Sequence, residues 1–217
     1  MDDVSRETPD PPEVARRVFG ISLPVAVRYA ALLGDAGVVR GLIGPRETPR
    51  LWERHLVNCA LLAEGIGAKA SVADIGSGAG LPGMVLALCR PDMTVTLVEP
   101  LQRRAEFLTE AVATLGLNRV EVVRARAEDL HGQRRFDVVV SRAVAPLTKL
   151  LRWCLPLTMS DGQVLAMKGA SAERELADAQ IVLRRLNAGP ADVVRYGAGI
   201  IDPPTTAIRV ARSAVRD

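Results

Sequence analysis

The stretch from Val72 to Gly83, with the sequence VADIGSGAGLPG, constrains the fold more than any other. Its apolar start predicts a buried strand, its alternating glycines cannot pack a core, and Pro82 suits the first turn of a helix expected over 81–89. In a strand, glycine turn and helix N-terminus of this kind, backbone N–H groups face outward and a ligand can approach the chain closely. The stretch therefore predicts a ligand-binding loop.

Strands and helices alternate after this loop. The apolar runs predict the strands 71–75, 94–99, 120–124, 136–141 and 163–167, followed by 193–196 and 206–210. Helical periodicity lies between them at 102–115, 147–156 and 172–186. Short, nearly all-apolar strands separated by helices predict an α/β fold, with a mostly parallel, seven-stranded, Rossmann-like sheet covered on both faces.

The chain before the loop has a different pattern. Prolines among charged residues predict a mobile tail over 1–12. Two short helices between Glu13 and Val39 and one helix over 51–62 predict an N-terminal helical extension, 13–68, packed on the core domain 69–217.

Composition bounds the class of protein. The chain of 217 residues is 48% apolar, enough to bury one sizeable core. It shows no apolar run of about 18 residues and its N-terminus is charged, so we expect a cytoplasmic protein without a membrane partner. Three separated cysteines and two histidines form no ligand cluster, so we expect no metal. The net charge of +3 suits a polyanion such as RNA.

Three kinds of glycine loop compete for this motif. A P-loop ends in Gly-Lys-Ser/Thr, whereas this loop ends in Leu-Pro-Gly, which argues against a nucleoside triphosphate. The segment 78–83 does match the dinucleotide pattern G-x-G-x-x-G, and Glu99 follows about twenty residues later. However, Asp74 ends the first strand, where its negative charge would face a pyrophosphate.

S-adenosylmethionine fits this acid better, because it carries a sulfonium and an ammonium and has no phosphate. Glu99, at the end of the second strand, can accept hydrogen bonds from both ribose hydroxyls. We therefore favour a methyl-donor site formed by Asp74, Gly76, Gly78, Gly80 and Glu99. A dinucleotide site, or glycines that only make turns, stays open at this point.

Basic residues at strand ends are further candidates. Arg142 ends the strand 136–141 and Lys168 closes 163–167, where solvent is scarce, so we expect them to hold a phosphate or the donor's carboxylate. Arg54 and His55 lie on the helix 51–62 and are candidates for positioning the substrate, although a lone histidine is more often structural.

The chain also lacks two motifs for methyl acceptors that need activation. No cysteine lies beside a proline, and no Asn/Asp-Pro-Pro-aromatic turn follows the strand 136–141. This favours an acceptor with a free lone pair, such as N7 of guanine. Ala127 and Glu128, after the third strand, would contact an adenine edge or simply begin a helix.

Taken together, several motifs resemble one family. They are Arg54-His55-Leu56 with Asn58, the loop 74–83, Ser141-Arg142-Ala143 and Lys168-Gly169. The chain resembles the ribosomal RNA small subunit methyltransferase G family, also called glucose-inhibited division protein B. Relatives have Asp where this chain has Asn58, which puts a charged role there in doubt.

The resemblance implies a class I S-adenosylmethionine-dependent methyltransferase. Such an enzyme would methylate N7 of one guanine in the 530 loop of bacterial 16S rRNA, as a monomer acting on 16S rRNA or the 30S subunit. By motif, the donor-binding positions are Gly76, Leu81, Ala127, Glu128 and Arg142. Two alternatives remain, a small-molecule methyltransferase and a non-catalytic RNA-binding protein of the same fold.

Overall fold

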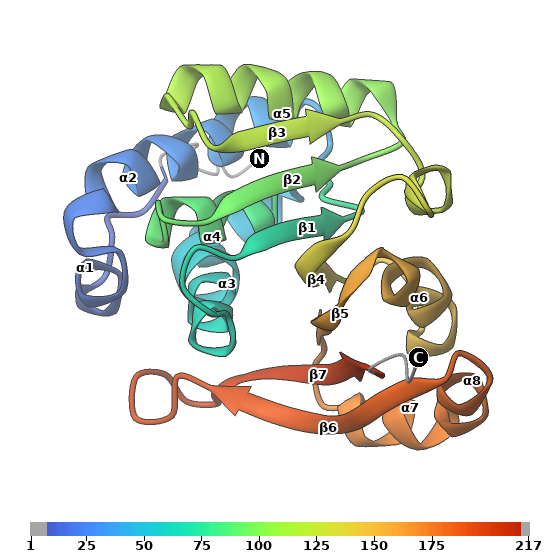
Figure 1. The fold of residues 1–217 in the computed structure, drawn as a ribbon. Coiled ribbons are helices and arrows are strands. Elements are labelled where there is room, and N and C mark those ends of the chain that lie inside the picture. Colours follow the sequence, from blue (N-terminus) through green and yellow to red (C-terminus); the bar gives the residue numbers. More distant parts are fainter. Residues whose placement is uncertain (1–7, 214–217) are drawn as a thin grey trace.

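A twisted sheet runs through the computed structural model, which describes residues 8–213 (Figure 1). Its strand order is β3-β2-β1-β4-β5-β7-β6. The strands are β1 (Ser71–Ile75), β2 (Thr94–Val98), β3 (Val120–Val123), β4 (Phe136–Arg142), β5 (Thr158–Met167), β6 (Ala188–Tyr196) and β7 (Thr205–Arg212). Every pair of neighbours is parallel except β5 with β7 and β6 with β7. This confirms the predicted mostly parallel, seven-stranded sheet.

The helices lie where the periodicity predicts them. They are α1 (Glu13–Phe19), α2 (Leu23–Leu32), α3 (Asn58–Leu61), α4 (Gly83–Cys89), α5 (Gln102–Leu115), α6 (Leu147–Cys154), α7 (Ala172–Asp178) and α8 (Gln180–Arg185). The helix predicted over 51–62 begins with π-helical turns at Leu51–Val57 and continues into α3.

Several predicted boundaries are wrong, including that of β6, which begins at Ala188, five residues before the predicted start at 193. The helix expected from residue 81 begins at Gly83, because Leu81 and Pro82 still belong to the loop. The helix expected over 172–186 is interrupted at Ala179. The strand β5 begins at Thr158, five residues before the predicted start, because Ser160, Asp161 and Gly162, which suggest a turn, belong to an irregular stretch of the strand.

Two apolar layers cover the two faces of the sheet, as alternation along each strand requires. Val72 and Leu97 point to the layer formed with α1 to α5. Ala73, one residue further on, points to the other layer, formed with α6, α7 and α8. Figure 1 shows the blue and green helices on one side and the orange helices on the other. The carboxyl ends of β1, β2 and β4 are left between these layers.

The N-terminal extension shares the first layer. Ala15, Phe19 and Tyr29 are buried in the same cluster as the sheet residues. The indole Nε1 of Trp52 donates a hydrogen bond of 2.7 Å to the carbonyl oxygen of Pro9, inside the predicted tail. Residues 1–7 of that tail lie outside the described residues. The domain boundary at 68/69 stays a prediction, since apolar contacts run continuously across it.

The extension also contains an apolar helical segment, Glu13–Gly37, that is long enough to cross a membrane by length and composition alone. The expectation that no such run exists is therefore wrong. The criterion is a weak one, because core helices of soluble proteins meet it as well. Here the backbone turns at Gly20, with φ of 48°, so the segment is two helices rather than one.

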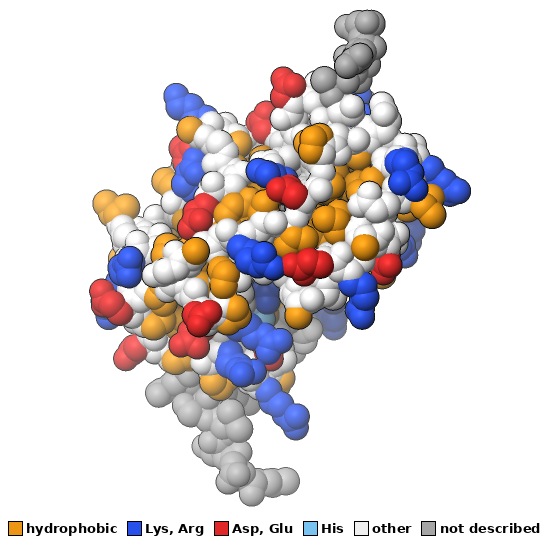
Figure 2. Space-filling view, turned by 90° about the horizontal axis from the view of Figure 1, so that it is seen from below, with side chains coloured by type: hydrophobic (Ala, Val, Ile, Leu, Met, Phe, Trp, Pro, Cys, Tyr) orange, Lys and Arg blue, Asp and Glu red, His pale blue; other side chains and the backbone are white. Residues whose placement is uncertain are grey.

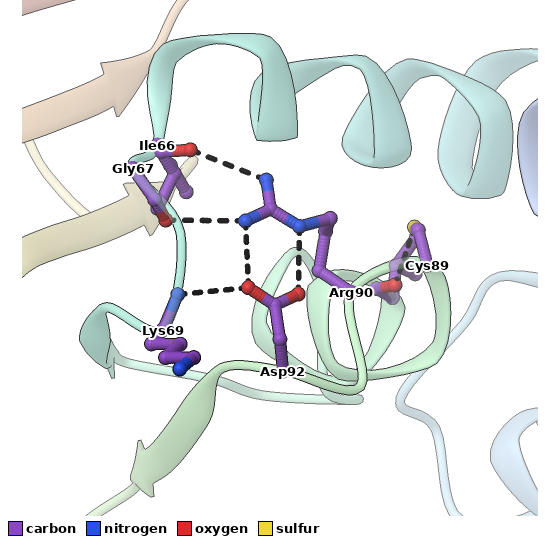
Figure 3. Close-up of polar contacts among 7 residues, drawn as sticks. Ile66, Gly67, Lys69, Cys89, Arg90 and Asp92 are labelled. Carbon is purple, nitrogen blue, oxygen red and sulfur yellow. Dashed lines mark hydrogen bonds and ion pairs between the residues drawn. The ribbon is translucent and has the colours of Figure 1, made fainter.

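A polar cluster ties the end of α4 to the segment that leads into β1 (Figure 3). The Arg90 guanidinium donates to both carboxylate oxygens of Asp92, at 2.8 Å each, and to the carbonyl oxygens of Ile66 and Gly67. Asp92 also accepts a hydrogen bond of 2.8 Å from the backbone N–H of Lys69. Arg90 holds the pKa of Asp92 well below its usual range. The cluster fixes the turn that enters β1, and with it the start of the strand that leads into the glycine loop.

Replacing Asp92 by alanine is expected to lower the free energy of unfolding by about 1–2 kcal/mol, because three hydrogen bonds are lost at a partly exposed site. Urea unfolding at pH 7 measures the change. Glu53→Ala, which removes an exposed carboxylate, is the control. An equal loss in both variants would contradict a stabilising role for the cluster.

Candidate functional site

A cavity of about 760 Å³ opens at the carboxyl ends of β1, β2 and β4. Ligands bind at this edge in open α/β sheets. Eight of the residues predicted from the sequence line the cavity, namely His55, Gly76, Gly78, Leu81, Glu99, Ala127, Glu128 and Arg142. Asp74, Gly80, Arg54 and Lys168 do not line it. The structure therefore gathers most of the predicted donor-site residues around one space and places four others beside it.

Neighbouring side chains pack closely against the backbone of the glycine loop, so the loop has no room for a Cβ at Gly76 or Gly80. Gly76 has φ of 71°, and a Cβ there would lie 2.7 Å from Cγ2 of Val144. A Cβ at Gly80 would lie 2.7 Å from the hydroxyl oxygen of Tyr29. That hydroxyl donates a hydrogen bond of 2.7 Å to the carbonyl oxygen of Ala79. Burial raises the pKa of Tyr29 well above its usual value, so the hydroxyl stays a donor. The helical extension thus supports the loop from beneath.

Asp74 lies under the loop and does not line the cavity, so the expectation that its charge would face a ligand is wrong. The side chain is 0% exposed. Its Oδ2 accepts a hydrogen bond of 2.9 Å from the backbone N–H of Gly83, while Oδ1 has no partner. Burial raises the pKa of Asp74 to about 7. The carboxyl group anchors the first residue of α4, and its unpartnered oxygen leaves a site where nearby positive charge would be stabilised.

Gly83→Ala is expected to lower the free energy of unfolding by about 1–3 kcal/mol, as overpacking in a core does. A Cβ at Gly83 would lie 2.5 Å from Cδ2 of Leu97 and 2.7 Å from Cβ of Asp74. Thermal and urea unfolding measure the loss. Gly67→Ala is the matched control, because a Cβ there meets nothing within 4 Å. Equal stability of the two variants would contradict the packing described for the loop.

Glu99 is 2% exposed and connects the loop to β2. Its Oε2 accepts a hydrogen bond of 2.9 Å from the backbone N–H of Gly78, and its Oε1 accepts one of 3.0 Å from Leu101. The Nη1 atom of Arg104 lies 3.9 Å from Oε2. A carboxylate has about four acceptor positions, so each oxygen can still accept a hydrogen bond from a ligand hydroxyl.

Arg142, at the end of β4, reaches across to the helical extension. Its Nη2 lies 2.6 Å from Nδ1 of His55, and its Nη1 donates to Sγ of Cys59 at 3.2 Å. The other ring nitrogen of His55, Nε2, lies 2.8 Å from Oε2 of Glu47. Cys59 therefore contacts a charged group. Burial still raises the pKa of its thiol.

Lys168 and Arg54 lie outside the cavity. The Nζ atom of Lys168 donates a hydrogen bond of 2.9 Å to the carbonyl oxygen of Ala145 and pairs with Glu175 at 2.8 Å. Lys168 therefore holds the segment that follows Arg142. Arg54 is largely exposed and pairs with Glu47 at 3.5 Å. Both residues were predicted as site residues, but the structure places them near the cavity and not in its lining.

Asn58, the residue that departs from the family pattern, has a structural contact. Its Oδ1 accepts a hydrogen bond of 2.7 Å from Oγ1 of Thr205. This bond links α3 to the start of β7. An amide can make it without a charge.

Several residues of the site could not be found from the sequence, and three of them make or limit its polar contacts. Tyr29 and Glu47 come from the extension, and Val144 follows Arg142 in the cavity wall. No motif spacing connects Glu47 to His55, because the bond between them depends on a turn of the chain. Among residues 8–213, no group of three or more His, Cys, Asp or Glu side chains is placed to hold a metal ion.

The basic residues are distributed unevenly. Arg104 and Arg126 line the cavity, whereas Arg134 forms an ion pair with Glu121. On the face seen in Figure 2, acidic and apolar side chains are scattered, and several Lys and Arg side chains gather in the lower centre of the view.

Comparison with known proteins agrees with the resemblance that the sequence motifs indicate. A family model described as rRNA small subunit methyltransferase G matches residues 23–199. The ribosomal RNA small subunit methyltransferase G of Nocardioides sp. is 60% identical over 210 residues, covering 96% of this chain and 84% of that protein. The protein of the same name from Thermobifida fusca is 58% identical, covering 92% and 84%.

A solved structure shows the same fold. The precorrin-6y C5,15-methyltransferase from Geobacter metallireducens has a TM-score of 0.54 and 17% identity, covering 72% of this chain and 88% of that chain. Family model and relatives agree over most of the chain, and their match includes the loop, Glu99 and Arg142 within residues 23–199. The chain belongs to the rRNA small subunit methyltransferase G family.

Proposed function

We propose that this protein transfers a methyl group from S-adenosylmethionine to N7 of one guanine in the 530 loop of bacterial 16S rRNA. Methyl transfer to small-subunit rRNA follows from membership of the rRNA small subunit methyltransferase G family. The observation that carries the assignment to this site is the cavity over the glycine loop, bounded by Glu99 on one side and Arg142 on the other. We further propose that the protein acts as a monomer in the cytoplasm, on 16S rRNA or the 30S subunit.

The residues present fit the methyl donor. Glu99 has acceptor positions left for two ribose hydroxyls, and Gly76 lets a ligand approach the backbone beside Val144. The unpartnered Oδ1 of Asp74 favours positive charge above the loop. Ala127 and Glu128 line the part of the cavity where an adenine edge would lie. S-adenosylmethionine, when bound, supplies an electrophilic methyl group on a cationic sulfur.

The site offers alignment rather than an available base at its most buried positions. Both ring nitrogens of His55 have hydrogen-bond partners, and Nδ1 accepts from the guanidinium of Arg142. An acceptor that must lose a proton would need one of these groups to be free. N7 of guanine carries a lone pair and needs no deprotonation. The arrangement therefore supports a ring nitrogen as acceptor, with the protein holding it in line and excluding water.

An assay with labelled S-adenosylmethionine tests the proposal directly. The substrates are 30S subunits and free 16S rRNA from cells that lack the modification. We expect label in one guanine, at N7. Label in a small molecule of the extract but not in RNA would support a small-molecule methyltransferase. Binding of RNA without any label would support a non-catalytic RNA-binding protein. Either result would overturn the proposal.

A further inference from the structure

We propose that Glu47 and His55 are positioning residues that hold the guanidinium of Arg142 in one orientation in the cavity, through a single tautomer of His55. The inference rests on the proposed function for its effect on methyl transfer. Its structural content can be measured on the protein alone.

The tautomer follows from which atoms can donate. An arginine side chain has only donors, so Nδ1 of His55, 2.6 Å from Nη2 of Arg142, must accept. The proton of the neutral ring is then on Nε2, which lies 2.8 Å from Oε2 of Glu47 and donates to it. The three side chains form a directed chain of hydrogen bonds from arginine to imidazole to carboxylate. In the other tautomer the proton would be on Nδ1, so two donors, Nδ1 of His55 and Nη2 of Arg142, would face each other.

These hydrogen bonds connect the N-terminal helical extension to the sheet. Glu47 lies in the turn before the π-helical segment Leu51–Val57, His55 lies within that segment, and Arg142 ends β4. His55 is 8% exposed and lines the cavity together with Arg142, whereas Glu47 does not line it. Glu47 therefore acts on the site only through His55. The extension thereby sets the direction of a charged group on the sheet.

The backbone on either side of Arg142 is fixed by the β4–β5 pairing and by Lys168, so the direction of the guanidinium depends on the acceptors that it contacts. The next residue, Ala143, has φ of 55°, which an alanine rarely adopts, and Lys168 holds the following backbone at Ala145. Cys59 offers a second acceptor for Nη1 at 3.2 Å, but a thiol is a weak one. The neutral imidazole is the stronger of the two acceptors in contact with the guanidinium.

Low pH should break the hydrogen bond between His55 and Arg142. Protonation of His55 turns Nδ1 into a donor, which then faces the guanidinium of Arg142 with like charge. The charged groups facing the ring are Glu47, Arg54 and Arg142, and Arg142 in turn faces Cys59, Tyr29 and Asp74. Burial and then Arg142 lower the pKa of His55, while Glu47 raises it. The ring is therefore neutral at neutral pH, and removing the charge of Glu47 lowers its pKa further.

Nitrogen-15 NMR of the imidazole rings tests the structural content without any substrate. His55 is distinguished from the second histidine, His131, by a His131→Gln variant. At pH 7.5 we expect His55 to be neutral with its proton on Nε2. In Glu47→Gln, whose amide oxygen can still accept from Nε2, we expect the same tautomer and a lower pKa. A proton on Nδ1, or a charged ring at pH 7.5, would overturn the proposal.

Two further measurements connect the chain to the site. The affinity for S-adenosylhomocysteine and the methylation rate are followed from pH 5 to 8. We expect His55→Ala to lower kcat/KM roughly 100-fold, as misplacement of a functional group does, and His55→Asn, which keeps an acceptor near the position of Nδ1, to restore part of it. Glu47→Gln should move the acid limb of the pH profile to lower pH.

The matched control is Glu53→Gln, which removes an exposed carboxylate from the same helical segment and should leave the limb in place. An unmoved limb in Glu47→Gln, or equal losses in His55→Ala and His55→Asn, would overturn the positioning role. The NMR and methylation results can also differ. If NMR shows the expected tautomer but neither the parent protein nor any variant methylates RNA, the proposed function is wrong and the hydrogen bonds between Glu47, His55 and Arg142 are still confirmed.

Discussion

Arg142→Ala should lower methylation of undermethylated 30S subunits by about 1000-fold while the fold stays intact. The guanidinium lines the cavity and is held by His55 and Cys59, so its donors are aimed before any substrate binds. Fixed donors of this kind contribute more than exposed ones because no reorganisation is needed and water is excluded. Alanine leaves an uncharged gap at this position.

The measurement is a single-turnover rate with labelled donor, with circular dichroism and thermal unfolding as controls for the fold. Arg142→Lys keeps the charge but cannot donate to His55 and Cys59 at once, so we expect an intermediate rate. A rate within a few fold of the parent protein for Arg142→Ala would show that the guanidinium takes no part in the reaction.

The charge of Asp74 should produce a second large effect, on stability rather than on rate. Its pKa is raised to about 7 in the folded protein, whereas the unfolded value is about 3.9. The folded state therefore binds a proton that the unfolded state has released, between about pH 4 and 7. The contribution of this group is complete below the unfolded pKa and is lost as pH rises through 7. The slope is about 1.4 kcal/mol per pH unit at most.

Asp74→Asn isolates this contribution, because the amide oxygen can still accept from the backbone N–H of Gly83. The difference in unfolding free energy between parent and variant should fall by up to about 3 kcal/mol from pH 5 to pH 7. Subtraction removes the opposing effects of His55 and of the carboxylates whose pKa is lowered, such as Glu47. A difference that does not change with pH would show that Asp74 is already ionised at pH 5.

Much of this architecture could be predicted from the sequence, and the reasons are physical. Strands buried on both faces read as apolar runs, and the loop after β1 has glycines where the backbone needs φ near 71° or close packing. Strand ends at one edge of a parallel sheet bring Glu99 and Arg142 to the same cavity. These features depend on local sequence and on topology.

Features that depend on side-chain direction could not be predicted. The same rules place Asp74 at a strand end, yet packing of α4 turns its carboxyl group beneath the loop, against Gly83. Lys168 likewise ends a strand and points to the backbone at Ala145 instead of the cavity. Glu47 lies in the short 3₁₀ helix Pro45–Arg50, whose sequence shows no periodicity that would indicate which way a side chain points. The predicted β5 is too short because Ser160, Asp161 and Gly162 resemble a turn.

The most direct test is a map of N7-methylguanine in 16S rRNA from bacteria with and without this protein. Chemical cleavage at N7-methylguanine, read by reverse transcription, gives every modified position in one experiment. We expect one position, in the 530 loop, to disappear with the protein, to return with the parent gene and to stay absent with Arg142→Ala. An unchanged map, or loss of a different modification, would contradict the assignment of this cavity to guanine N7.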